Sequence, residues 1–310
     1  HFYFLLKILF KNIPYIDEAL PVDQYGTISN VALSNDELWQ KIADDFQYGV
    51  DHLPVRQMDR GRADKYAAAA YLAKTYLYKA YRQGNSQSHE VTAINADDLN
   101  KVVTYADMVI ASQYKMESDF AYNFLPGSYE NGPESIFAVQ YSGDDGTKFG
   151  RVNLADLLSV PMKLGCCDFL KPSQTLVNAF RTQNGLPAFD NYNNKDNGHS
   201  AKNDPRLFHT VALPGFAYKY NETLIYDVDW NRNPGTYGAY ASLKENVDPT
   251  CDCFVPMVPF YANTKNRILI RHADLLLMKA EALVELKRWN EALSIINSVR
   301  NRAKNSTGLI

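Results

Sequence analysis

Hydrophobic residues recur at helical spacing near the start of the chain. Ser34 and Glu37 form a capping box, in which each side chain satisfies a backbone amide of the other residue. The apolar positions behind it recur every four residues: Leu38, Ile42, Phe46 and Val50. This pattern predicts a helix that ends near Leu53, because the residue before a proline such as Pro54 disfavours helical backbone.

Further helical patterns follow. Residues 64–82 are rich in alanine, which lets a neighbouring helix approach closely, so we expect this helix to lie at the centre of a helical layer. Asn95 is expected to cap a third helix that ends near Ser112. A shorter helix is predicted from Ser173 to Phe180, closed by Gly185.

The clearest pattern lies near the end of the chain. Residues 271–286 and 289–303 both carry apolar residues at helical spacing and are joined at about Lys287 and Arg288. So short a connection predicts an antiparallel pair of helices. Several such pairs indicate a helical-repeat architecture, although no regular 34-residue period is convincing.

The middle of the chain has a different character. Ser135–Tyr141 and Phe208–Leu213 are predicted strands. Residues 184–262 are rich in Asn, Gly, Pro and aromatic residues, and so long an irregular stretch is typical of a functional or a disordered segment. The aromatic content favours function. At the N-terminus, Phe2–Phe10 is too short to span a bilayer and lacks a signal-peptide cleavage site, so it is predicted to be the tail of a helix.

Composition excludes several classes of protein. With 46% hydrophobic and 22% charged residues in 310, the chain is neither disordered nor a coiled coil, and its net charge of −3 argues against nucleic acid as a partner. The 21 tyrosines are numerous, and tyrosine suits a binding surface because its ring stacks while its hydroxyl stays solvated. The cysteines, Cys166–Cys167 and Cys251-x-Cys253, have no zinc or redox spacing; free thiols or one disulfide are both open.

Two helical motifs at the end of the chain resemble a known family. Arg271–Ala282 (RHADLLLMKAEA) is similar to the "RYADVLLMYAEA" helix of SusD/RagB-like proteins, and Ala292–Ala303 is similar to the run that follows it there. Weaker fragments resemble the family in the same order: Phe2–Pro14, Gly61–Ala63, Tyr105–Ile110, Ser135–Tyr141, Phe180–Pro187 and Asn203–Leu207.

The resemblance implies a mainly α fold with a TPR-like scaffold of paired helices, a large irregular region and a few short strands. Residues 1–310 are expected to form a single SusD-like domain, truncated at both ends. Within it, residues 1–112 and 264–304 would be the helical scaffold and residues 113–263 the loop-rich, ligand-binding part.

The resemblance also implies a function. Such proteins are outer-membrane lipoproteins at the cell surface that capture glycans, or in some members peptides, and cover a SusC-type TonB-dependent transporter. The lipid anchor would lie outside this chain. No catalytic residue, metal or cofactor is implied, and the family's ligand-binding residues cannot be transferred by motif.

Residues 216–240 are the best candidate for a glycan site, because flat aromatic rings alternate there with amides and carboxylates. The predicted ligand-binding residues are Trp230, Tyr237, Tyr240, Tyr226, Asp229 and Asn231. The alternative is that these rings fill the core of an irregular region. The same choice applies to Phe216, Tyr218 and Tyr220, which would share one face of an extended segment.

Other interpretations stay open at this point. Residues 120–129 are a second aromatic candidate, and Asp190–Gly198 superficially resembles a calcium loop but has Lys195 where an oxygen ligand belongs. Peptide binding is the alternative within the family. A glycoside hydrolase, which needs two facing carboxylates, and a helical protein-interaction scaffold are the remote alternatives.

Overall fold

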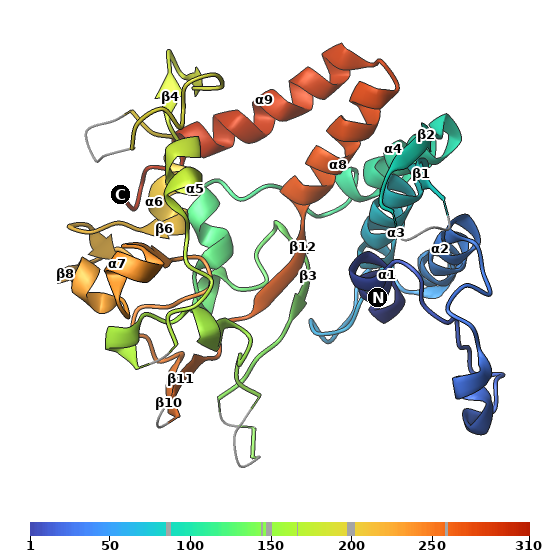
Figure 1. Cartoon of the computed structure of the whole chain (residues 1–310), viewed down its shortest axis with the longest axis horizontal. Helices are drawn as coiled ribbons and strands as arrows, with labels where there is room; N and C mark the ends of the chain where they lie inside the picture. The colour runs from blue at the N-terminus through green and yellow to red at the C-terminus, as the bar shows by residue number, and fades with distance from the viewer. Residues whose placement is uncertain (85–87, 144, 147–150, 166, 197–201, 258–259) are drawn as a thin grey trace. The chain divides into compact units, whose positions relative to one another are not determined.

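The computed structural model describes residues 1–84, 88–143, 145–146, 151–165, 167–196, 202–257 and 260–310 (Figure 1). The chain divides into two compact units. We call residues 1–115 and 270–297 the helical unit, and residues 116–269 and 298–310 the loop-rich unit. The predicted fold class, mainly α with a few short strands, is confirmed. That the whole chain forms one SusD-like domain stays a prediction.

The helical unit contains most of the long helices. They are α1 (Phe2–Phe10), α2 (Asn35–His52), α3 (Lys65–Ala80), α4 (Ala96–Ile110) and α8 (His272–Glu285), and α9 (Trp289–Asn305) begins here. A short 3-10 helix (Val22–Thr27) precedes α2, and the strands β1 (Tyr81–Gln83) and β2 (Val91–Ile94) pair between α3 and α4. Among the described residues, no helix combines the length and the apolar character needed to cross a membrane.

The predicted helix starts are confirmed because local side chains cap them. The Ser34 hydroxyl accepts the amide N–H of Glu37 at 3.2 Å, and the Glu37 carboxylate accepts the amide N–H of Ser34 at 2.8 Å. Asp64 and Asn95 cap α3 and α4 in the same way, each accepting a first-turn amide. These bonds satisfy donors that a helix leaves without a partner at its N-terminus.

The alanine-rich helix α3 packs against both α2 and α4, as predicted. Its alanines from Ala67 to Ala70, with Ala73 and Ala80, are buried. Because a methyl group keeps neighbouring backbones close, the small residues of α3 let helices pack on both sides of it. Helix α4 in turn packs against α8, which completes a layered helical scaffold within this unit.

The loop-rich unit is built from short elements. Its helices are α5 (Gln174–Ala179), α6 (Arg206–Thr210) and α7 (Pro234–Tyr237), with 3-10 turns at Phe120–Phe124, Gly127–Tyr129, Asp156–Ser159, Met162–Leu164 and Val228–Trp230. The antiparallel strand pairs are β4–β5 (Thr182–Gln183, Leu186–Pro187), β6–β9 (Val211–Ala212, Ala241–Ser242), β7–β8 (Ala217–Tyr218, Asn221–Ile225) and β10–β11 (Phe254–Met257, Phe260–Asn263). Strand β3 (Ser135–Val139) pairs with β12 (Arg267–Arg271).

Two local predictions are wrong. Phe208–Leu213 is not one strand, because its first residues belong to α6 and only the end forms β6. The Asp204 carboxylate accepts the amide N–H of Arg206 at 3.0 Å in a turn just before α6, whose N-cap is Pro205. Gly185 does not close α5, which ends at Ala179; it lies instead in the β4–β5 turn with positive φ, where glycine is favoured.

The structure contains neither of the two expected cysteine states, free thiols or a single disulfide, because the described cysteines belong to more than one disulfide. Cys251 and Cys253 form a disulfide. Cys167 is also in a disulfide, whereas Cys166 lies outside the described residues. The candidate calcium loop, Asp190–Gly198, is described only as far as Asp196. The described residues contain no cluster of metal-ligating side chains.

Lys219 is buried in the loop-rich unit although it carries an ammonium group. Its Nζ donates to the backbone oxygens of Leu243 at 2.9 Å and Phe124 at 3.2 Å. Burial, reinforced by the charge of Lys265, lowers the pKa of Lys219 to about 7. In the unfolded chain the pKa is that of an ordinary lysine, about 10.4, so the unfolded chain binds more protons between these two values.

We therefore expect stability to rise as the pH is raised from 7 to 9. Linkage sets the contribution of Lys219 to this gain at up to about 2 kcal/mol. Chemical denaturation at several pH values measures it, with Lys219→Met as the comparison. The variant should show a flatter dependence on pH. Equal slopes for the two proteins would mean that Lys219 titrates normally.

Candidate functional site

Two of the predicted ligand-binding rings are core residues. Trp230 is only 1% exposed and packs against Tyr218 and Tyr226, with ring centroids 5.2 and 5.3 Å away. Lys163 covers the indole, its Nζ lying 5.1 Å from the ring centroid. The expected exposure of Trp230 and Tyr226 is therefore wrong, and the core alternative holds for these two rings and for Tyr218. Neither ring offers a face to a ligand in this structure.

Asn231 and Tyr226 use their polar groups inside the protein. The Tyr226 hydroxyl donates to Asn231 Oδ1 at 2.9 Å, and Asn231 Nδ2 donates to the Val228 carbonyl oxygen at 3.0 Å. Lys171 also donates to Asn231 Oδ1. Burial raises the pKa of Tyr226, so its hydroxyl keeps its proton. These groups hold the loop together and stabilise the segment that follows.

The remaining predicted residues differ in accessibility. The Tyr240 hydroxyl donates to Gln174 Oε1 at 2.8 Å and its ring is half-buried. Asp229 is exposed and lies 3.9 Å from Lys163 Nζ. Tyr237, on the single turn of α7, is 53% exposed. A ligand site at these positions stays a prediction. Of the four predicted aromatic rings, Tyr237 is the exposed one.

Tyr237 belongs to an exposed cluster that the sequence did not indicate. The Arg232 guanidinium carbon lies 5.2 Å from the Tyr237 ring centroid and 5.0 Å from that of Phe169. Phe169 is 50% exposed. We call Phe169, Arg232 and Tyr237 the aromatic–arginine surface. Two accessible rings with a guanidinium over both combine stacking faces with hydrogen-bond donors, which is what a sugar ring and its hydroxyls require.

Buried groups hold this surface in place. The amide N–H of Phe169 donates to the Leu158 carbonyl oxygen at 2.7 Å. The amide N–H of Arg232 donates to Asp168 Oδ2 at 2.8 Å, while Lys171 neutralises Asp168 from 2.8 Å. Asp168 has positive φ, an uncommon conformation for a residue other than glycine. One buried carboxylate therefore fixes both the backbone next to Phe169 and the backbone of Arg232.

Phe169 and Arg232 were missed because they are 63 residues apart in the chain. The available signal was the apolar pair Phe169–Leu170 between Asp168 and Lys171, a pattern too short for a buried strand. That pattern does not predict which distant residue the Phe169 ring will contact.

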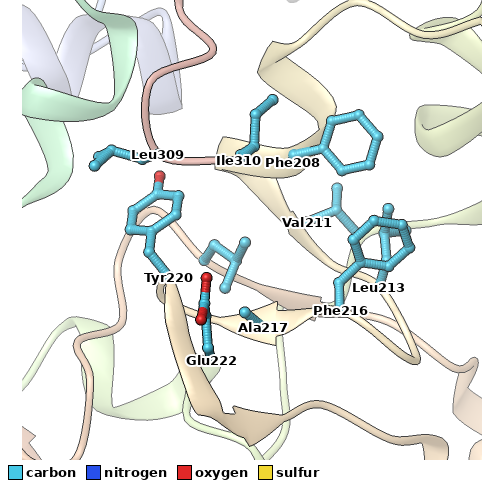
Figure 2. Close-up of a pocket in the computed structure, with 10 residues that line it drawn as sticks. Phe208, Val211, Leu213, Phe216, Ala217, Tyr220, Glu222, Leu309 and Ile310 are labelled. Atoms are coloured by element: carbon cyan, nitrogen blue, oxygen red, sulfur yellow. The ribbon is translucent and has the colours of Figure 1, made fainter.

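A second feature of the loop-rich unit is an apolar cavity of about 370 Å³ (Figure 2). Its lining consists of Phe208, Val211, Leu213, Phe216, Ala217, Tyr220, Glu222, Leu243, Leu309 and Ile310. The expected common face of Phe216, Tyr218 and Tyr220 is not formed, because Lys219 and Tyr220 have positive φ and break the extended backbone. Phe216 and Tyr220 line the cavity, whereas Tyr218 is in the core.

The cavity offers few free polar groups. His209 Nε2 donates to the Ser306 carbonyl oxygen at 2.7 Å, so in the neutral ring Nδ1 accepts the proton of the Tyr220 hydroxyl at 2.8 Å. Burial lowers the pKa of His209 and keeps this ring neutral. With the Tyr220 hydroxyl engaged, Glu222 is the charged group at the cavity. The lining suits an apolar side chain better than a sugar.

The second aromatic candidate, residues 120–129, is only partly accessible. Phe120 is buried against Phe124. Tyr122 and Tyr129 lie with ring centroids 4.8 Å apart, and Tyr129 is exposed. Lys244 Nζ lies 5.1 and 5.0 Å from the ring centroids of Phe120 and Phe124, but Phe120 is buried. Both rings of the aromatic–arginine surface are about half exposed, so that surface is the stronger candidate.

Comparison with known proteins identifies the family. A sequence profile of the SusD family matches residues 133–308, more than half of the chain. The chain belongs to the SusD family. SusD-like protein P2 of Formosa agariphila is 26% identical to this SusD-family chain. The aligned region covers 99% of this chain and 54% of protein P2. SusD-like protein P38 of the same organism is 26% identical over 56% of the chain and 31% of the relative. The predicted resemblance is thus confirmed.

Solved structures show the same fold. A SusD-like carbohydrate-binding protein of Bacteroides fragilis superposes with a TM-score of 0.71 at 19% identity, covering 97% of this chain and 56% of that one. A structure determined with a xylogluco-oligosaccharide superposes with a TM-score of 0.64 at 20% identity, covering 97% and 56%. The chain spans about half the length of these structures and of protein P2.

Proposed function

We propose that this protein binds oligosaccharides at the cell surface without cleaving them and delivers them to a SusC-type TonB-dependent transporter. It would be held at the outer membrane by a lipid anchor outside this chain. Membership of the SusD family supports this role. The fold shared with a carbohydrate-binding protein and with a structure that contains a xylogluco-oligosaccharide supports glycan as the ligand class.

The observation that carries the proposal is the aromatic–arginine surface. Its two rings are about half exposed, although burying a ring removes apolar area from water and is favourable. Flat apolar faces left in water at a fixed spacing are suited to the C–H faces of a sugar. Since Asp168 fixes the backbone of this surface, little ordering remains to be done when a ligand binds.

We expect Tyr237→Ala and Phe169→Ala each to weaken oligosaccharide binding by about 2 kcal/mol or more, roughly 30-fold. Each removes one stacking face and leaves the core untouched. Titration calorimetry against a panel of oligosaccharides measures the effect. Tyr48→Ala is the matched control, because Tyr48 is 66% exposed but lies on α2 of the helical unit.

The control should bind as the wild type does. Full affinity in both site variants would exclude the aromatic–arginine surface as the binding site. Release of shorter sugars during the titration would instead favour the hydrolase alternative.

Peptide binding is the second candidate, and the apolar cavity favours it. Its volume of about 370 Å³ and its apolar lining match the side chain of a hydrophobic residue. A peptide that binds there should lose affinity in Phe216→Ala and keep it in Tyr237→Ala. If Tyr237→Ala loses affinity and Phe216→Ala keeps it, the ligand binds at the aromatic–arginine surface instead.

A further inference from the structure

The Arg232 guanidinium stands out by what surrounds it. It lies over two exposed rings, and its Nε–H is buried without a hydrogen-bond partner among the residues that the structure describes. Several other arginines of the loop-rich unit pair with a carboxylate, such as Arg302 with Glu134 and Arg206 with Asp204, although Arg181 does not within the described residues. Arg232 has none within the described part of the chain.

The nearby carboxylates are engaged elsewhere. Asp168 accepts the backbone amide of Arg232 and pairs with Lys171, so both of its oxygens are occupied. The Asp227 side chain accepts the amide of Val228. Asp229 lies beside Lys163. Among the described residues, none of these carboxylates forms an ion pair with Arg232, so its guanidinium is not directly paired with an anion.

A guanidinium that lacks a carboxylate partner is suited to binding an anionic group of a ligand. Its planar donors match the paired oxygens of a carboxylate or a sulfate, and such charge-assisted bonds are about twice as strong as those to neutral groups. The rings of Phe169 and Tyr237 already restrict the side chain, so less freedom is lost on binding. A sugar stacked on either ring would bring its substituents within reach of the guanidinium.

We propose that the glycan bound at this surface carries an anionic group, a uronate carboxylate or a sulfate ester, that pairs with Arg232. This inference rests on the proposed glycan-binding function and names its substrate class. Neutral oligosaccharides would use the rings alone.

Matched ligand pairs test the inference. One arm compares a galacturonate oligomer with the neutral galactose oligomer of equal length and linkage, and the other compares a sulfated galactan oligosaccharide with its desulfated form. Calorimetry on the wild type should favour the anionic member of at least one pair by about tenfold or more, the effect of a charge-assisted hydrogen bond. The arm that responds identifies carboxylate or sulfate as the recognised group.

Variants of Arg232 and Tyr237 separate the contribution of the charge to ligand affinity from that of the rings. Arg232→Gln should abolish the preference and leave the affinity for the neutral member within about threefold, whereas Tyr237→Ala should weaken both members. Arg232→Lys, which keeps the charge but not the planar donors, should retain part of the preference. Thermal unfolding of Arg232→Gln should stay close to the wild type, because the guanidinium contacts only two half-exposed rings and its Nε–H has no hydrogen-bond partner among the described residues.

Three results would overturn the inference, and they are distinguishable. Equal binding of both members of each pair, or a preference that survives Arg232→Gln, refutes the role of Arg232 while the glycan-binding function stands. Failure to bind any oligosaccharide refutes the proposed function, and the inference falls with it.

Discussion

Glu134→Ala is expected to lower the free energy of unfolding of the loop-rich unit by about 3–5 kcal/mol. Glu134 is fully buried and pairs with Arg302 of α9, which is buried as well. Its Oε2 also accepts the amide N–H of Glu117 at 2.8 Å and the Asn123 side chain at 3.1 Å. Without this carboxylate, the buried Arg302 charge would lose its directly paired counter-ion.

Chemical denaturation followed by circular dichroism measures this loss. The matched control is Glu291→Ala, which removes the carboxylate of an exposed Arg–Glu pair with Arg288 and should change stability little. Replacing Glu134 and Arg302 together by methionine should cost less than Glu134→Ala, because no buried charge is then left over. A loss for Glu134→Ala no larger than that of the control would show that the buried pair is not what holds α9 to this unit.

Trp230→Ala is expected to destabilise the same unit by about 3–5 kcal/mol, the cost of removing a large buried aromatic side chain. The indole fills the space between Tyr218, Tyr226 and Leu243 in one core cluster. Its removal leaves a cavity that these neighbours cannot close without distorting β7 and β8. Thermal and chemical unfolding measure the loss, and Trp230→Phe should recover part of it.

Comparison with Tyr237→Ala separates the core from the surface. Tyr237 lies seven residues further along the chain and is half exposed, so its truncation should leave the unfolding free energy nearly unchanged while weakening ligand binding. A Trp230→Ala protein with full stability and lost binding would contradict the placement of Trp230 in the core.

Helices of the scaffold could be predicted because their signals are local. Ser34, Asp64 and Asn95 each cap a helix through a contact within three residues, and the apolar spacing of the following residues shows which face is buried. The prediction failed for Phe208–Leu213, where apolar residues are as frequent in a short helix as in a strand. There the turn at Asp204, just outside the segment, leads directly into the helix.

The candidate site was predicted less well than the fold. The segment around Trp230 and Tyr237 was found by composition, but composition does not say which ring is buried. Tyr218 and Lys163, respectively 12 and 67 residues before Trp230, cover its indole. Phe169, which completes the exposed surface with Arg232 and Tyr237, was marked only by the short apolar pair that it forms with Leu170.

The family, the mainly α fold class and the starts of the capped helices could be predicted from the chain alone, because motif order, apolar period and capping are properties of neighbouring residues. The burial of Trp230 in the core and the common surface of Phe169, Arg232 and Tyr237 became visible in the folded structure. Burial and long-range pairing depend on which distant segments pack together. In an irregular region without period, the local pattern places no constraint on that choice.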